Sequence, residues 1–147
     1  MAYDSASIER FFARYEEGAN TFDTDTVVSE FTSVFMSADP GGVACISNDG
    51  EFRAAIPRRK ALFEKIGFQS ANICSLSPTP LDERYTMVKV EWRMIFEKNV
   101  GSPQEFIFFI TYILFDDGSG PKVAFYISHD DETETMREAG LIPDGEE

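Results

Sequence analysis

Residues 85–130 read YTMVKVEWRMIFEK at 85–98, NVGSPQ at 99–104, EFIFFITYILF at 105–115, DDGSGP at 116–121 and KVAFYISHD at 122–130. Three apolar segments therefore follow one another, and only short linkers rich in turn-forming residues separate them. The first segment alternates between apolar and charged residues, which is typical of a strand with one buried face. We predict an antiparallel meander of three strands.

The middle segment is apolar on both faces of a strand, because Phe106 and Phe108 alternate with Ile107 and Phe109. A strand of this kind must be covered on both sides. Helices of the same chain can cover one face of the sheet. A second copy of the chain is the simplest cover for the other face, so we expect a homodimer through the sheet.

The first half of the chain shows helical patterns. Apolar residues at three- and four-residue steps predict a helix that begins between residues 4 and 7, ends near residue 20 and carries Tyr15 on its buried side. Asp23 to Asp25 offer caps for a short second helix whose apolar positions include Phe31. Asn48 and Glu51 have the spacing of a capping box for a third helix.

Proline and glycine punctuate the remaining elements. Pro57 either kinks the third helix or begins it, and Gly67 ends it. The sequence ADPGG at 38–42 is a turn between two short strand-like pieces, and a weaker strand at 68–77 ends before Pro78. Residues 131–140 predict a last short helix, with a capping-box spacing at its start.

This order of elements predicts an α+β fold in which a curved antiparallel sheet wraps around the N-terminal helices. No repeat or linker divides the chain of 147 residues. We therefore expect a single domain at 1–140, followed at 141–147 by an acidic tail that is expected to be disordered.

Composition limits the partners. The chain has 13 Lys and Arg against 26 Asp and Glu, a formal net charge of −13, which argues against nucleic acid and anionic membrane surfaces as partners. Cys45 and Cys74 have no CxxC spacing, and we expect both thiols to be reduced. Residues 1–30 lack the apolar core of a signal peptide, and the longest apolar run, 106–115, is half the roughly 20 residues that a spanning helix needs. These observations predict a cytoplasmic protein.

Three short motifs carry a family resemblance: Arg14-Tyr15, Phe31 and Asp39-Pro40. Together with the order of elements, they resemble the nuclear-transport-factor-2-like superfamily, which includes ketosteroid isomerases, scytalone dehydratase and SnoaL-like cyclases, over residues 7–131. The chain is most similar to uncharacterised SnoaL-like members. The resemblance implies a cystatin-like cone with a pocket, in which Tyr15 donates to an oxyanion and Asp39 acts as a base. The second donor of the isomerases would fall near Thr111 or Tyr112, and neither is an acid.

Asp39 and Tyr15 are therefore our candidate catalytic residues. Burial of Asp39 in an apolar cone would raise its proton affinity, although Asp before Pro-Gly also commonly opens a turn. A cone leaves a cavity that aromatic side chains must line, so we expect a small apolar ligand there. The candidate ligand-binding residues are Trp92, Tyr112, Phe108 and His129.

Two charged clusters have structural interpretations. His129, Asp130 and Asp131, with the glutamates that follow, resemble metal ligands, but acids at a helix start are favoured by capping and by the helix dipole. We expect no metal and no cofactor. The basic run 58–60 either holds an anionic ligand or forms a solvated helix face.

Two functional hypotheses remain open from the sequence. In the first, the chain is a cofactor-independent isomerase or lyase that moves a proton on an apolar substrate. In the second, it is a binding or dimerisation module whose pocket is filled or no longer catalytic. The position of Asp39 separates them, because an enzyme should direct this carboxylate and Tyr15 into one cavity.

Overall fold

The computed structural model describes residues 4–142. The elements in chain order are α1 (Ser5–Thr21), α2 (Thr24–Ser29), β1 (Phe31–Asp39), β2 (Gly42–Ser47), α3 (Gly50–Lys65), β3 (Phe68–Pro80), β4 (Tyr85–Phe96), β5 (Gln104–Asp116), β6 (Pro121–Ser128) and α4 (Glu132–Glu138). The predicted α+β architecture is confirmed.

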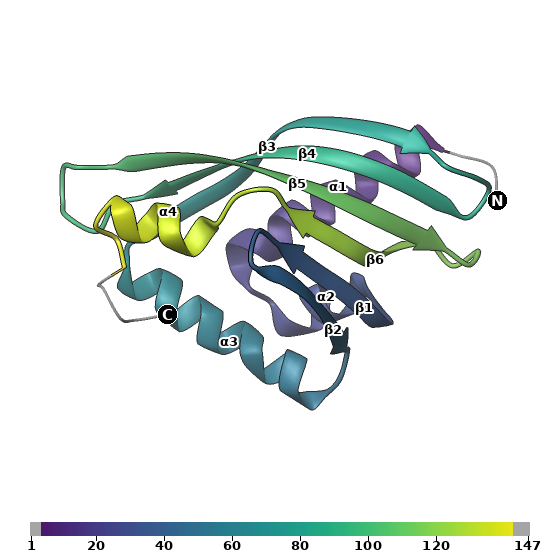
Figure 1. The fold of residues 1–147 in the computed structure, drawn as a ribbon, viewed down its shortest axis with the longest axis horizontal. Helices are drawn as coiled ribbons and strands as arrows, with labels where there is room; N and C mark the ends of the chain where they lie inside the picture. Colours follow the sequence, from purple (N-terminus) through teal and green to yellow (C-terminus); the bar gives the residue numbers. More distant parts are fainter. Residues whose placement is uncertain (1–3, 143–147) are drawn as a thin grey trace.

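One six-stranded sheet has the order β2-β1-β6-β5-β4-β3. Neighbouring strands are antiparallel except for β1 and β6, which run parallel. The sheet is curved and does not close, and its long strands β3, β4 and β5 arch over the helices (Figure 1). The predicted meander corresponds to β4, β5 and β6.

The concave side of the sheet holds the core. In β4 the alternation predicted from the sequence is confirmed, because Val88, Val90, Trp92, Met94 and Phe96 are all buried. Phe11 and Phe12 of α1 and Phe63 of α3 pack into the same cluster. Burial of so many large aromatic side chains supplies the main driving force for folding.

Several local predictions need correction. The cap of α3 is Asp49, whose carboxylate accepts from Glu51 N (3.0 Å) and Phe52 N (3.3 Å), and not Asn48. The side chain of Asn48 instead donates to the backbone carbonyl of Val28 at 2.9 Å. Phe31 begins β1 and is not part of α2.

Prolines are tolerated at two unexpected positions. Helix α3 is continuous from Gly50 and contains Pro57 in its interior, so Pro57 does not begin it. Strand β3 continues through Pro78 to Pro80. It lies at the edge of the sheet, where a residue without an N–H group costs no central ladder hydrogen bond.

The C-terminal end of the described chain belongs to the domain. Leu141 and Ile142, which the sequence interpretation assigned to the tail, are 1% and 3% exposed and pack in the core. The backbone carbonyl of Leu141 accepts from Lys98 Nζ at 3.0 Å. The rest of the predicted tail, 143–147, lies outside the described residues.

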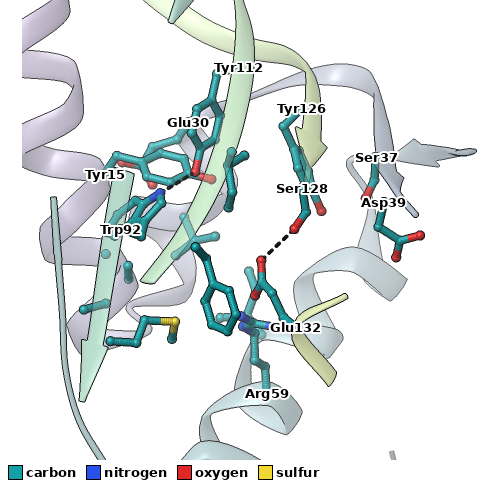
Figure 2. Close-up of a pocket in the computed structure, with 18 of the residues that line it drawn as sticks. Tyr15, Glu30, Ser37, Asp39, Arg59, Trp92, Tyr112, Tyr126, Ser128 and Glu132 are labelled. Carbon is teal, nitrogen blue, oxygen red and sulfur yellow. Dashed lines mark hydrogen bonds between the residues drawn. The ribbon is translucent and has the colours of Figure 1, made fainter. Parts of the chain in front are cut away.

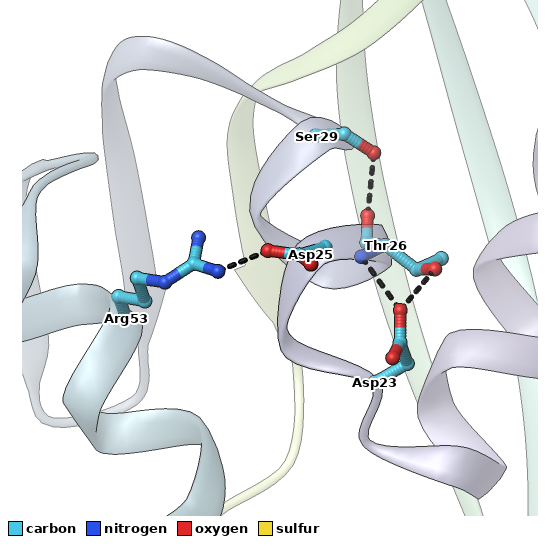
Figure 3. Close-up of polar contacts among 5 residues, drawn as sticks. All are labelled: Asp23, Asp25, Thr26, Ser29 and Arg53. Atoms are coloured by element: carbon cyan, nitrogen blue, oxygen red, sulfur yellow. Dashed lines mark hydrogen bonds and ion pairs between the residues drawn. The ribbon is translucent and has the colours of Figure 1, made fainter.

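Polar contacts cap α2, and one ion pair links this helix to α3 (Figure 3). Asp23 caps α2 by accepting from Thr26 N at 3.0 Å and Thr26 Oγ1 at 2.6 Å, as the sequence predicted for this segment. Asp25 forms an ion pair with Arg53 of α3. These contacts matter for the site, because the residue that follows α2 is Glu30.

Candidate functional site

A cavity of about 410 Å³ lies between the helices and the concave face of the sheet. Its walls are mainly apolar and come from all four described helices and five strands. The apolar lining residues are Ala19, Phe22, Val27, Phe31, Ala38, Phe52, Ala55, Ile56, Phe63, Ala71, Met94, Phe108 and Ile110. A volume of this size suits a small molecule of two or three fused rings.

The inner end of the cavity carries a group of aromatic hydrogen-bonding side chains (Figure 2). Trp92 Nε1 donates to the Tyr112 hydroxyl at 3.0 Å, and both residues are buried. The rings of Tyr15 and Tyr112 meet edge to face, with centroids 5.3 Å apart. The Phe108 side chain lines the same cavity.

Both phenols keep their protons at neutral pH. Burial raises the pKa of Tyr15 well above its ordinary value, and the nearby Tyr112 contributes in the same direction. Burial also raises the pKa of Tyr112. The hydrogen bond between the two hydroxyls adds to the rise in the pKa of Tyr15 and opposes the rise in the pKa of Tyr112, so Tyr15 is the donor and Tyr112 the acceptor. Because Tyr112 also accepts from Trp92, its own hydroxyl proton is left to donate to a ligand.

Glu30 lies beside this aromatic group (Figure 2) and is only 4% exposed. Its Oε2 has no hydrogen-bond partner among the residues that the structure describes. Burial raises the pKa of this carboxyl from 4.5 to about 8, and Arg14 opposes the shift. A buried acid with a displaced pKa in a cavity is a strong candidate for proton transfer.

The backbone around Glu30 is firmly placed. Its N–H donates to Val27 O at 3.1 Å and its carbonyl accepts from Val123 N at 2.8 Å, so α2 and β6 fix its position. Gly18 of α1 faces the carboxyl, and a Cβ there would stand 3.3 Å from Glu30 Oε1. The lack of a side chain at this position leaves room for the buried acid.

Asp39 does not lie where the resemblance implied. It is exposed at the rim, and its Oδ1 accepts from Gly41 N at 2.8 Å in the turn between β1 and β2. Figure 2 shows it on the opposite side of the cavity from Tyr15. The predicted burial of Asp39 is wrong, because this turn lies at the mouth of the cone. Asp39 and Tyr15 line the same cavity but at opposite ends, and the acid that lies beside Tyr15 is Glu30.

His129 lies outside the cavity. The residue is exposed, and its Nε2 lies 2.7 Å from Thr111 Oγ1. His129 is not among the residues that line the cavity. Adjacent residues of a strand point to opposite faces, and it is the neighbouring Ser128 that faces the cavity. The predicted ligand-binding role of His129 is therefore not supported by its position.

A second polar group lines the outer part of the cavity (Figure 2). The hydroxyl of Ser128 donates to Glu132 Oε2 at 2.8 Å. Burial raises the pKa of Glu132, while Arg59 opposes the shift. The Arg59 guanidinium itself lies over the Phe63 ring, 4.4 Å from its centroid.

The acids at the start of α4 have a structural role. Asp131 caps this helix by accepting from Glu134 N at 3.0 Å, as predicted. Within 4–142, no group of three or more His, Cys, Asp or Glu side chains is placed to hold a metal ion. Cys45 and Cys74 are both free thiols.

Comparison with solved structures identifies the fold. A ketosteroid isomerase-like protein from Erwinia carotovora atroseptica superposes with a TM-score of 0.62 at 19% identity, over 86% of this chain and 97% of that chain. The chain has the NTF-2-like, cystatin-like fold. An NTF-2-like protein of unknown function from Shewanella oneidensis gives a TM-score of 0.66 at 17% identity, over 86% and 98% of the two chains.

A third neighbour is a protein of unknown function with a cystatin-like fold from Nostoc punctiforme, with a TM-score of 0.67 at 12% identity over 89% and 96% of the two chains. Neither a family model nor a curated protein matches the sequence. The resemblance inferred from the sequence is therefore confirmed for the fold. None of the helices between residues 4 and 142 combines the length and the hydrophobicity of a membrane-spanning segment.

Glu30 is the site residue that the sequence interpretation missed. It stands in the segment VVSEF at 27–31, so a single charge lies among uncharged residues directly before the buried Phe31. This isolated charge is the sequence feature that could have identified Glu30 as a candidate site residue. Trp92, Tyr112 and Phe108, which were proposed from strand alternation, do line the cavity.

Proposed function

We propose that this NTF-2-like chain binds a small, mostly apolar molecule in the cavity and transfers a proton on it without a metal or an organic cofactor. The observation that carries the proposal is the buried Glu30 carboxyl, with its unpartnered Oε2, beside Tyr15 at the inner end of an apolar cavity. A group with a pKa of about 8 exchanges protons readily near neutral pH.

Glu30 and the tyrosine pair have complementary roles in this reaction. Ionised Glu30 removes a proton from a carbon next to a carbonyl; the electrons of that C–H bond form a C=C bond, and the π electrons of the carbonyl move to its oxygen. The Tyr112 hydroxyl, which accepts from Tyr15 and Trp92, donates to this oxygen as its negative charge develops. Glu30 then returns the proton to carbon, at the same or a conjugated position, which gives isomerase-type chemistry.

Exchange of hydrogen for deuterium tests the proposal without knowledge of the natural substrate. We expect the chain to accelerate the loss of α-protons from a bicyclic ketone such as 2-decalone in deuterated buffer, followed by NMR. Ala55→Trp, which fills the cavity from α3, is expected to remove the acceleration. Binding of the ketone without exchange would reject catalysis and favour the binding-module hypothesis.

We also propose that two copies associate through the convex face of the sheet. Large apolar side chains are exposed on this face, among them Met36 at 39%, Ile107 at 38% and Phe109 at 47%. The exposed Arg93 and Glu105 form an ion pair across β4 and β5. A patch that mixes apolar and paired charged groups suits a two-fold contact with a second copy.

Sedimentation equilibrium tests this association. The wild-type chain is expected to be a dimer, and Ile107→Lys/Phe109→Lys is expected to be a monomer with unchanged secondary structure, because both side chains are already exposed. Val100→Lys, in the fully exposed β4–β5 turn, is the matched control and should leave the dimer intact. A monomeric wild-type chain would exclude this interface. The cytoplasmic location stays a prediction.

A further inference from the structure

The mouth of the cavity is strongly acidic. Asp39 at the end of β1 and Asp130, Asp131 and Glu132 before and within the start of α4 all line it. Arg59 is the one cationic side chain among the described residues of the lining. The inner end of the same cavity holds the unpartnered, 4% exposed Glu30, so the mouth is the outer part of a ligand site and not an isolated acidic cluster.

Backbone groups fix three of these carboxylates. Asp39 Oδ1 accepts from Gly41 N at 2.8 Å, Asp130 Oδ2 accepts from Phe109 N at 3.0 Å, and Asp131 Oδ1 accepts from Glu134 N at 3.0 Å. A peptide N–H carries no net charge. These hydrogen bonds therefore hold the carboxylates in place without cancelling their negative charge.

The excess of negative charge at the mouth does not depend on Glu132. Ser128 Oγ donates to Asp130 O at 3.0 Å and to Glu132 Oε2 at 2.8 Å, so the two acceptors share its one proton. Burial raises the pKa of Glu132, whereas Arg59 and the hydrogen bond from Ser128 oppose the shift. Without Glu132, three aspartates face one Arg59, which leaves an excess of negative charge.

We propose that the mouth binds a cationic group, a protonated amine, at the outer end of an apolar ligand whose other end lies against Tyr15 and Glu30. This inference rests on the proposed function, because it assumes that the cavity is a ligand site. The formal charge of −13 acts in the same sense over a longer range, since it attracts cations and repels carboxylates.

Three probes with the same apolar body test the charge preference: 1-adamantanemethylamine, 1-adamantanemethanol and 1-adamantanecarboxylate. Trp92 is the only tryptophan and lines the cavity, so its fluorescence reports binding, with calorimetry as a second measurement. We expect the amine to bind about tenfold or more tightly than the carboxylate at low salt, with the alcohol between them. The preference should weaken as salt is added, because screening reduces interactions between exposed charges.

Matched variants locate the preference. Asp39→Asn/Asp130→Asn keeps side-chain oxygens that can accept from the backbone but removes two charges from the mouth, and it should bring the amine and carboxylate affinities within a few fold of each other. Asp82→Asn/Asp117→Asn removes the same charge from exposed turns outside the cavity and should leave the preference unchanged. Binding of the alcohol should be similar in all these proteins.

Two results would overturn the proposal in distinguishable ways. If all three probes bind with similar affinity, the cavity is a ligand site but its mouth does not select a cation. If the preference for the amine disappears in Glu30→Gln and persists in Asp39→Asn/Asp130→Asn, the amine binds at the inner end. Failure of every probe to bind would instead reject the ligand site, and with it the proposed function.

Discussion

Glu30→Gln is expected to reduce the rate of α-proton exchange by about 10²–10⁴-fold, the usual contribution of a positioned general acid or base. Glutamine has nearly the same shape but cannot accept and return a proton. Because Glu30 contacts the inner end of the cavity, binding of the ketone should change by much less than the exchange rate. NMR of the ketone in deuterated buffer measures both quantities.

Asp39→Asn is the informative contrast in the same assay. Asp39 is exposed at the rim, and its carboxylate accepts from the turn at Gly41, so this variant should exchange a neutral ketone within about twofold of the wild-type rate. A loss of exchange in Asp39→Asn with normal exchange in Glu30→Gln would restore the assignment that the resemblance implied. It would also reject the role that we propose for Glu30.

Glu30→Gln is also expected to alter the dependence of stability on pH. The folded chain holds a proton on Glu30 up to about pH 8, whereas the unfolded chain releases it near the ordinary pKa of 4.5. The stabilisation linked to this proton is complete below pH 4.5 and is lost as the pH rises to about 8. The loss corresponds to roughly 3–5 kcal/mol, and the glutamine variant should not show it.

Urea denaturation at about pH 4 and about pH 8.5 measures this difference. Wild type should lose free energy of unfolding as the pH rises from the lower to the higher value, and Glu30→Gln should lose less. The stability of the variant relative to wild type should therefore increase with pH. Glu30→Met, which has no polar atom to leave unpaired, should give the same trend if the glutamine amide disturbs the fold. Glu17→Gln removes an exposed carboxylate from α1 and should follow the wild-type curve. Parallel curves for Glu30→Gln and wild type would contradict a proton held by Glu30.

The sheet could be predicted because its signals are local. Alternation in 85–96 identifies β4 and its buried face, and glycine-rich linkers identify both turns of the meander. Caps at Asp23 and Asp131 also follow from short-range chemistry. Where two acceptors stood side by side, as at Asn48 and Asp49, the sequence could not decide between them, because the choice depends on contacts of Asn48 with residues far along the chain.

The site was less predictable because it depends on tertiary position. Tyr15 and Trp92 were found from their place on buried faces, but nothing local shows that the turn at Asp39 lies at the rim. Glu30 ends a short helix, a position where a glutamate is ordinarily solvated. Only the approach of Gly18 from α1 and the strand β6 on the other side bury it.

Direct titration of the Glu30 carboxyl is the decisive measurement. In protein labelled with ¹³C at the glutamate side-chain carboxyls, the Glu30 resonance is identified by its absence from the spectrum of Glu30→Gln. We predict that this resonance titrates with a midpoint at about 8. A midpoint near the ordinary value of 4.5 would show that the carboxyl is not held in a buried, protonated state, and would contradict the site and the chemistry built on it.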